Sequence, residues 1–249
     1  MLQNYSNLPK LAKLIIFPIW LFVSFYMSQA LVTGLVWILV TLHIPLSSMN
    51  QAVLNSLFSA LLYLITLAFV IGLPWLIKRS HISREDIGLT RLPSWTDIFI
   101  TPAGLVVYFI SSAVLILIAT KLFPGFDVNQ IQNTGFSQLN ERYEYILAFA
   151  TLVIIAPIAE EILFRGYLFG KLKKFAPVWV AIIITSVLFG LIHGAWNLAV
   201  DTFALSVILC LLREFTGNIW ASILLHMAKN GIAFYFLFIN PSLFTILSK

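Results

Sequence analysis

The chain has 249 residues, of which 60% are hydrophobic and only 10% are charged. Soluble domains carry about 25% charged residues, so this composition excludes a water-soluble globular protein. A formal net charge of +5 could suit nucleic acid, but no cluster of arginines and aromatic residues accompanies it. We therefore expect no nucleic-acid partner, and we expect the basic residues to set orientation in a membrane.

Long apolar stretches follow one another along the chain. A transmembrane helix needs about 20 mostly apolar residues, and seven stretches approach or exceed that length. In chain order they are residues 14–42, 52–77, 98–120, 145–169, 177–192, 198–212 and 219–239. The first is longer than the apolar region of a signal peptide and has no cleavage site, so we expect a retained span. An eighth span would come from a split of this first stretch or from a half-inserted segment at 126–136.

These stretches predict an all-α fold, a polytopic transmembrane helix bundle with seven to eight spans. Membrane lipids would surround it, and residues 1–249 would form a single integral membrane domain, because no segment between the spans is long enough to fold alone. The lone Cys210 lies in an apolar stretch, where we expect a small buried hydrophobic side chain.

Basic residues recur on every second loop between the predicted spans. They are Lys10 and Lys13 before the first span, Lys78, Arg79, Arg84 and Arg91 in the second loop, Lys171, Lys173 and Lys174 in the fourth, and Arg213 in the sixth. Lysine and arginine favour cytoplasmic loops. We therefore predict a cytoplasmic N-terminus in a multi-pass protein of a prokaryotic plasma membrane.

Ionisable side chains inside the predicted spans concentrate between residues 150 and 235. Each costs at least ~2.5–3.5 kcal/mol at mid-span, so such side chains persist where they are paired, hydrated or functional. On a helix, Glu161 and Arg165 are four residues apart in the favourable order for an ion pair, whereas Glu160 points about 100° away. Glu161 is therefore interpreted as structural and Glu160 as available, with a bend at Pro157 making room for water. From this segment alone, a buried structural cluster of all three charges stays open.

Two further polar pairs lie in the later spans. Phe189 and His193 are four residues apart, as are His226 and Asn230, so each pair shares a helix face. Taken singly, such a histidine is typical of an interfacial residue, and a histidine with an asparagine is typical of helix–helix contacts. Together with Glu160 they supply a carboxylate, two imidazoles and an amide. Peptide hydrolysis needs a base that activates water and donors that hold an oxyanion, so this set predicts a catalytic site.

Three motifs resemble those of the CAAX-protease and bacteriocin-processing (Abi) family of intramembrane proteases. They are Glu160-Glu161-x-x-x-Arg165, Phe189-x-x-x-His193 and His226-x-x-x-Asn230. The usual lead-in to the last motif is matched by Thr216-Gly217-Asn218-Ile219-Trp220. The resemblance covers residues 150–235, which would form the catalytic core, and the chain before them is similar to the family only in being hydrophobic.

The resemblance implies an intramembrane endopeptidase whose catalytic cavity lies within the membrane. Glu160 would be the base that activates water, and His193 would help to position that water. His226 and Asn230 would form the oxyanion hole. Structural support of the site would come from Glu161, Arg165 and Phe189. Family members include enzymes that trim the tail of prenylated proteins, so the implied substrate is a membrane-associated peptide or lipidated protein.

Two other functions stay open from the sequence. One is a proton-coupled transporter, since intramembrane Glu and His also suit a proton relay, although the paired interrupted helices of many transporters are missing. The other is a non-catalytic membrane protein such as a bacteriocin self-immunity factor. For the cofactor, Glu160, His193 and His226 could bind Zn²⁺ and make a metalloprotease. The sequence has no His-Glu-x-x-His motif, and Asn230 is a poor zinc ligand, so we favour a mechanism without a metal and keep Zn²⁺ as the alternative.

Overall fold

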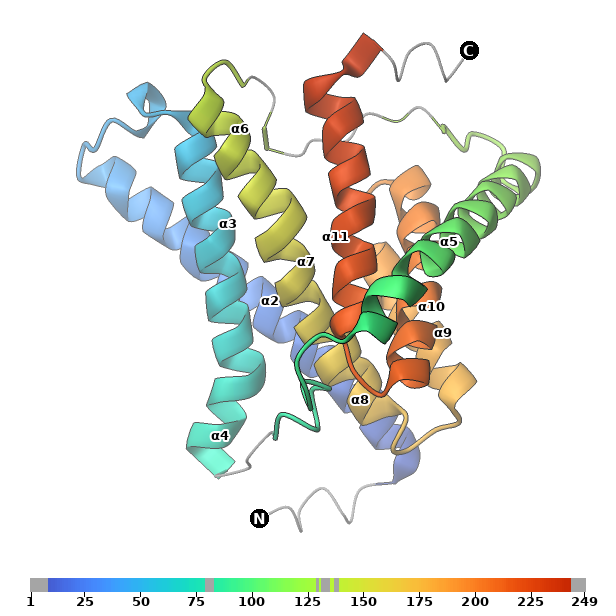
Figure 1. The fold of residues 1–249 in the computed structure, drawn as a ribbon. Coiled ribbons are helices and arrows are strands. Elements are labelled where there is room, and N and C mark those ends of the chain that lie inside the picture. Colours follow the sequence, from blue (N-terminus) through green and yellow to red (C-terminus); the bar gives the residue numbers. More distant parts are fainter. Residues whose placement is uncertain (1–8, 79–82, 129, 131–134, 137–138, 243–249) are drawn as a thin grey trace. The chain divides into compact units, whose positions relative to one another are not determined.

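The structure is a computed structural model that describes residues 9–78, 83–128, 130, 135–136 and 139–242. Over these residues the chain consists of helices, turns and connecting loops, without a strand. Figure 1 shows the helices coloured along the chain. The all-α prediction is confirmed.

Seven long helical runs make up most of the described chain, and several of them are assembled from shorter pieces. The first three runs are α2 (Lys10–Thr41), α3 (Gln51–Leu67) with η2 (Ala68–Gly72) and α4 (Leu73–Lys78), and α5 (Trp95–Leu122). The fourth run joins α6 (Arg142–Phe149), η3 (Ala150–Ile155), α7 (Ala156–Glu161), η4 (Ile162–Leu168) and α8 (Phe169–Leu172). The last three runs are α9 (Val178–Leu191), α10 (Trp196–Thr216), and α11 (Trp220–Phe234) with η5 (Tyr235–Ile239). The segments η2 to η5 are π-helical, and a short 3-10 turn, η1 (Leu46–Ser48), precedes α3.

Each predicted apolar stretch falls on one of these runs. Five segments of the described chain are long and apolar enough to cross a membrane: Lys10–Thr41, Gln51–Leu76, Trp95–Leu122, Arg142–Leu172 and Trp220–Ile239. The apolar helix Val178–Leu191 is shorter, and α10 contains the charged residues Asp201, Arg213 and Glu214. A membrane helical bundle therefore fits the structure, while the count of seven to eight spans stays a prediction.

The first apolar stretch does not split. α2 continues from Lys10 to Thr41, so the prediction of an extra span from this stretch is wrong. A break inside lipid would leave backbone groups without hydrogen-bond partners, and the stretch has no cluster of turn-forming residues that would favour one. The other candidate for an eighth span, residues 126–136, lies partly outside the described residues.

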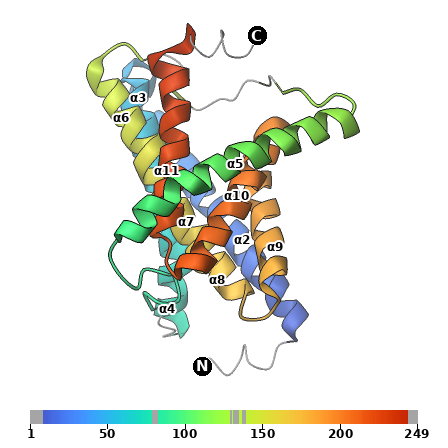
Figure 2. The same cartoon turned by 45° about the vertical axis from the view of Figure 1, so that its right-hand side comes forward.

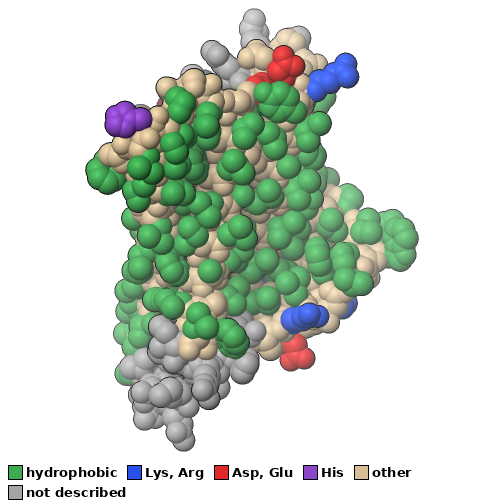
Figure 3. All heavy atoms as spheres, turned by 90° about the vertical axis from the view of Figure 1, so that its left-hand side faces the viewer, with side chains coloured by type: hydrophobic (Ala, Val, Ile, Leu, Met, Phe, Trp, Pro, Cys, Tyr) green, Lys and Arg blue, Asp and Glu red, His purple; other side chains and the backbone are tan. Residues whose placement is uncertain are grey.

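Apolar side chains cover most of the face drawn in Figure 3, and the acidic, basic and histidine side chains visible there lie near its margins. On α2, large apolar residues such as Ile19 and Leu31 are exposed. An extended exposed apolar surface is typical of a protein that contacts membrane or partner rather than water, as expected for an integral membrane protein.

Contacts within the chain divide it into two compact units. The first contains Met1–Pro18, His81–Gln132 and Glu160–His226. The second contains Ile19–Ser80, Asn133–Ala159 and Met227–Lys249. The first unit therefore holds most of the residues singled out for catalysis.

In the first unit, α10 packs against α9 and α5, and Figure 2 shows α5 crossing α10. A Cβ added at Gly190 of α9 would lie 2.7 Å from the Ala199 carbonyl oxygen of α10, so glycine permits the close approach that is common between membrane helices. Asp201 of α10 accepts hydrogen bonds from the hydroxyl groups of Tyr108 (2.7 Å) and Ser112 (2.6 Å) of α5. Asp201 therefore ties α10 to α5.

In the second unit, α3 packs against α6 and η3. Asn50 caps α3, because its Oδ1 accepts hydrogen bonds from the backbone of Ala52 (3.0 Å) and Val53 (3.2 Å). The Asn50 amide also donates to Tyr143 (2.9 Å) and to Glu144, both in the first turn of α6. The apolar core of this unit contains Ala52, Phe136, Ala148, Val153 and Phe234.

The orientation expected from the basic loops can be tested by cysteine labelling. In a Cys210→Ser background, which removes the single buried thiol, Lys173→Cys should react with a membrane-impermeant maleimide only after the cells are opened. The control Met49→Cys, in the turn between α2 and α3, should react in intact cells, because one crossing separates it from a cytoplasmic N-terminus. Labelling of Lys173→Cys in intact cells would contradict the predicted orientation.

Candidate active site

The two neighbouring acids lie in a helical run whose geometry is irregular on both sides of them. Glu160 and Glu161 end α7, which follows the π-helical η3 and precedes the π-helical η4. Pro157, in the first turn of α7, lacks a backbone N–H, and its ring crowds the carbonyl four residues earlier. The π-helical η3 ends just before Pro157, and π turns are frequent at functional sites. The bend that makes room for water stays a prediction.

The predicted ion pair between Glu161 and Arg165 forms. Arg165 Nη1 donates to Glu161 Oε1 at 2.8 Å, and both side chains are fully buried. The guanidinium carbon of Arg165 lies 4.3 Å from the centre of the Phe189 ring, a cation–π contact that covers one face of the charge. Arg165 is thus neutralised by Glu161 and packed by Phe189.

Glu161 has a second partner that the sequence did not predict. His226 Nδ1 lies 2.9 Å from Glu161 Oε1, and the imidazole is 3% exposed. A carboxylate accepts a hydrogen bond, so Nδ1 carries the hydrogen in this contact. The partners are 65 residues apart, and no local spacing in the sequence indicates the pairing. Glu161 therefore fixes the ring orientation of His226 as well as neutralising Arg165.

Glu160 faces the other nitrogen of the same imidazole. Its Oε2 lies 3.8 Å from His226 Nε2, which is close enough for electrostatic attraction but too long for a hydrogen bond. The Glu160 side chain is 13% exposed, whereas that of Glu161 is fully buried. Nδ1 of His226 thus faces Glu161, and Nε2 faces Glu160. Of these two acids, only Glu160 has a partly exposed side chain.

His193 follows the end of α9, and its ring is oriented by the backbone of its own helix. His193 Nδ1 lies 2.7 Å from the Phe189 carbonyl oxygen. Because a carbonyl only accepts, Nδ1 carries the hydrogen, and Nε2 is the acceptor nitrogen of the neutral ring.

Phe189 is the residue around which these side chains gather. Its ring is fully buried, and its centre lies 4.9 Å from that of His193 and 5.8 Å from that of His226. On the remaining sides it packs against Arg165 and edge-to-face against Phe164, with the Phe164 ring centre 4.9 Å away. The first unit thereby brings the two histidines and the Glu161–Arg165 pair around one aromatic ring.

Asn230 belongs to the second unit. It lies one turn after His226 on α11, so the two residues share a helix face. Its amide Nδ2 donates to the Leu152 carbonyl oxygen at 2.9 Å. In the π-helical η3 that carbonyl would meet the backbone nitrogen of Pro157, which has no hydrogen to donate. Asn230 therefore satisfies a carbonyl that the helix leaves unpaired, and its role as an oxyanion donor stays a prediction.

Zinc sites in enzymes commonly use three protein ligands and an open position. Over the described residues, no three His, Cys, Asp or Glu side chains are grouped so as to hold a metal ion. The pair formed by Glu160 Oε2 and His226 Nε2 supplies two donors. Zinc binding by Glu160, His193 and His226, and the favoured mechanism without a metal, therefore both stay predictions.

Comparison with known proteins finds similarity over the part of the chain that contains this site. Residues 142–232 match the family model described as Type II CAAX prenyl endopeptidase Rce1-like. The chain is 27% identical over 144 residues to the protein named Membrane-embedded CAAX protease MroQ of Staphylococcus aureus, an alignment that covers 55% of this chain and 57% of the relative. It is 34% identical over 102 residues to the protein YxdF of Lactococcus lactis subsp. lactis, covering 39% of this chain and 54% of that relative. No solved structure matches.

The alignments span little more than half the length of these relatives. The match to the family model includes all three motifs, from Glu160 to Asn230. The resemblance drawn from the motifs is confirmed, because residues 142–232 are similar to type II CAAX prenyl endopeptidases of the Rce1-like family.

Proposed function

We propose that this protein is an intramembrane endopeptidase that hydrolyses a peptide bond of a membrane-associated peptide or lipidated protein, using water activated by Glu160. The observation that carries the proposal is the pair formed by Glu160 and His226, whose imidazole is held on its far side by Glu161. A relative from Staphylococcus aureus is named a membrane-embedded CAAX protease, which supports peptide hydrolysis as the reaction.

In the proposed reaction, Glu160 takes a proton from water as the water oxygen attacks the carbonyl carbon of the substrate. The carbonyl π electrons move onto oxygen, and the resulting oxyanion accepts hydrogen bonds from His226 Nε2 and the Asn230 amide. Protonated Glu160 then gives its proton to the leaving nitrogen as the C–N bond breaks. A positioned base contributes typically 10²–10⁴-fold to the rate, and one oxyanion donor contributes about 10²–10³-fold.

The proposed role of His226 requires a hydrogen on Nε2. Its Nδ1 already donates to Glu161, so as an oxyanion donor the ring would carry hydrogens on both nitrogens, as the imidazolium does. Glu161 also pairs with Arg165, and the second acid, Glu160, faces the Nε2 side of the ring.

His193 has the complementary property. Its Nδ1 hydrogen is used by the Phe189 carbonyl, so the neutral ring offers an acceptor at Nε2. An acceptor can hold one hydrogen of the attacking water while Glu160 takes the other. His193 would therefore position water rather than donate to the oxyanion.

Replacement of Glu160 and replacement of Glu161 should differ in their effect on stability. Glu160→Gln keeps the shape of the side chain and removes the base, so the protein should insert and melt as the wild type does while losing about 10²–10⁴-fold of its activity. Glu161→Gln leaves Arg165 without its counter-charge, so we expect a stability loss of ~3–5 kcal/mol together with loss of activity. Thermal melts and one cleavage assay on purified variants measure both effects.

The double variant Glu161→Gln/Arg165→Leu is the control for this comparison. Removal of the uncompensated arginine should restore part of the melting temperature but not the activity, because His226 still lacks its carboxylate partner. An unstable Glu160→Gln beside a stable, inactive Glu161→Gln would show that the roles of the two acids are reversed.

Metal dependence provides a separate test of the water-activation step. Because the proposed mechanism uses Glu160 directly, activity of the purified protein should persist after treatment with EDTA or 1,10-phenanthroline. Loss of activity with a chelator, followed by recovery on addition of Zn²⁺ but not Mg²⁺, would replace this mechanism with a zinc-dependent one.

A further inference from the structure

A short segment before α5 contacts two of the three helical segments that supply the candidate site within the first unit, namely the acid-bearing run and the start of α11. It comprises residues 83–94, called here the strap. On one side its backbone lies against the acid-bearing helical run: Cβ atoms added at Gly166 and Gly170 would lie 2.8 Å from the Ile87 carbonyl oxygen and 2.9 Å from that of Asp86. Asp86 also accepts a 2.6 Å hydrogen bond from Lys174, just after α8. Only glycine at these two helix positions allows so close a contact.

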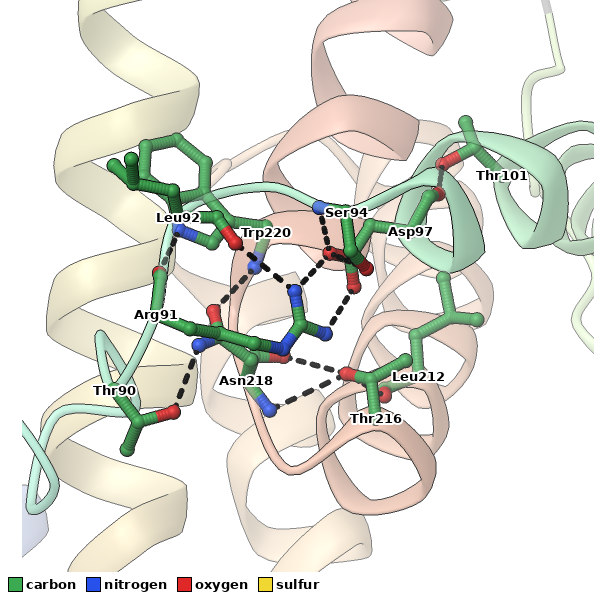
Figure 4. A network of polar contacts seen from close by, with 10 residues as sticks. All are labelled: Thr90, Arg91, Leu92, Ser94, Asp97, Thr101, Leu212, Thr216, Asn218 and Trp220. Atoms are coloured by element: carbon green, nitrogen blue, oxygen red, sulfur yellow. Dashed lines mark hydrogen bonds and ion pairs between the residues drawn. The ribbon is translucent and has the colours of Figure 1, made fainter.

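On its other side the strap binds the turn between α10 and α11. The backbone N–H of Ile219 donates to the Gly88 carbonyl oxygen at 3.0 Å. The Asn218 amide donates to Thr90 Oγ1 at 3.0 Å. Figure 4 shows this side-chain bond close to the next contact, in which Trp220 Nε1 donates to the Arg91 carbonyl oxygen. Three successive residues at the start of α11 are therefore each bonded to the strap.

The strap itself is anchored to the first turn of α5 by Asp97, which is fully buried. Asp97 Oδ2 accepts hydrogen bonds from the Ser94 backbone (2.8 Å) and the Ser94 hydroxyl (2.9 Å). Its Oδ1 accepts from Arg91 Nη2 at 2.9 Å, and this bond raises the pKa of Arg91 above its ordinary value. Arginine stays protonated at neutral pH in any case, and the anchor is an ion pair between Arg91 and Asp97 (Figure 4).

We infer that the strap is a positioning element that fixes where His226 lies along the axis of α11, relative to Glu160 and Glu161. His226 follows Trp220 by six residues on α11, which is ~9 Å along the helix axis. A slip of one residue would move the imidazole by ~1.5 Å, enough to separate Nδ1 from Glu161. Asn218 and Trp220 are thus positioning residues, and their effect on catalysis rests on the proposed function.

Two sets of variants loosen the strap from opposite sides. Thr90→Val with Trp220→Phe removes two side-chain bonds to the start of α11. Valine keeps the shape of threonine, and phenylalanine keeps an aromatic ring at position 220. Gly166→Ala pushes the Ile87 backbone away from the acid-bearing helix. Each has a matched control elsewhere: Thr66→Val, whose hydroxyl bonds only within α3, the exposed Trp95→Phe, and Gly34→Ala, which has open space around its added Cβ.

The ¹⁵N signals of the His226 ring report its position without requiring a substrate. The chain has four histidines, so a His226→Gln variant assigns them. We expect both strap variants to shift the His226 ring signals and to lower kcat by about tenfold to a hundredfold, with KM within about twofold of the wild type. The three controls should keep the wild-type signals and kcat.

Wild-type His226 signals in both folded strap variants would overturn the inference. A fall of kcat without any change in those signals would overturn it too, because the loss would then arise elsewhere. If the wild-type protein cleaves nothing while the strap variants still shift His226, the proposed function fails and the positioning role stands.

Discussion

The carboxylate of Glu161 is the group on which the rest of the site depends. It binds the guanidinium of Arg165 and the imidazole of His226 in a position without solvent exposure. Removal of one partner would leave an uncompensated buried charge, at a cost of ~3–5 kcal/mol. The bond between His226 Nδ1 and Glu161 also fixes the orientation of the imidazole, so that Nε2 faces Glu160. Glu161 therefore orients the proposed donor, His226, and neutralises Arg165 near the candidate base, Glu160.

The irregular geometry of the helical run before the two acids is linked to a polar contact from α11. Pro157 disturbs the acid-bearing run, and the preceding π-helical segment leaves the Leu152 carbonyl without a donor from its own helix. Asn230 supplies that donor. An asparagine that satisfies a backbone carbonyl in an apolar helix is stabilising in its own right, and Nδ2 carries two hydrogens, of which this bond uses one. A structural bond and the proposed oxyanion bond are thus compatible with one amide group.

Much of the helical content and the Glu161–Arg165 pair could be predicted from the sequence, because both depend on neighbours a few residues apart. The contact of Glu161 with His226 could not, since it joins residues 65 positions apart and follows from packing rather than spacing. The strap could not be predicted for a similar reason, since its bonds from Thr90 to Asn218 and from Arg91 to Trp220 join residues 128 and 129 positions apart. The sequence predicted the first stretch as one span but left a split open, because length alone does not distinguish one long helix from two short ones.

The central claim is that Glu160 makes this protein a catalyst within the membrane, rather than a binding partner that happens to contain the motifs. Comparison of the membrane peptidome in cells that express the wild type or Glu160→Gln at equal level tests it for any substrate present in those cells. The account predicts a set of cleavage products that is present with the wild type and missing with Glu160→Gln, together with loss of the biological phenotype. Identical peptidomes and an intact phenotype in the Glu160→Gln cells would contradict it.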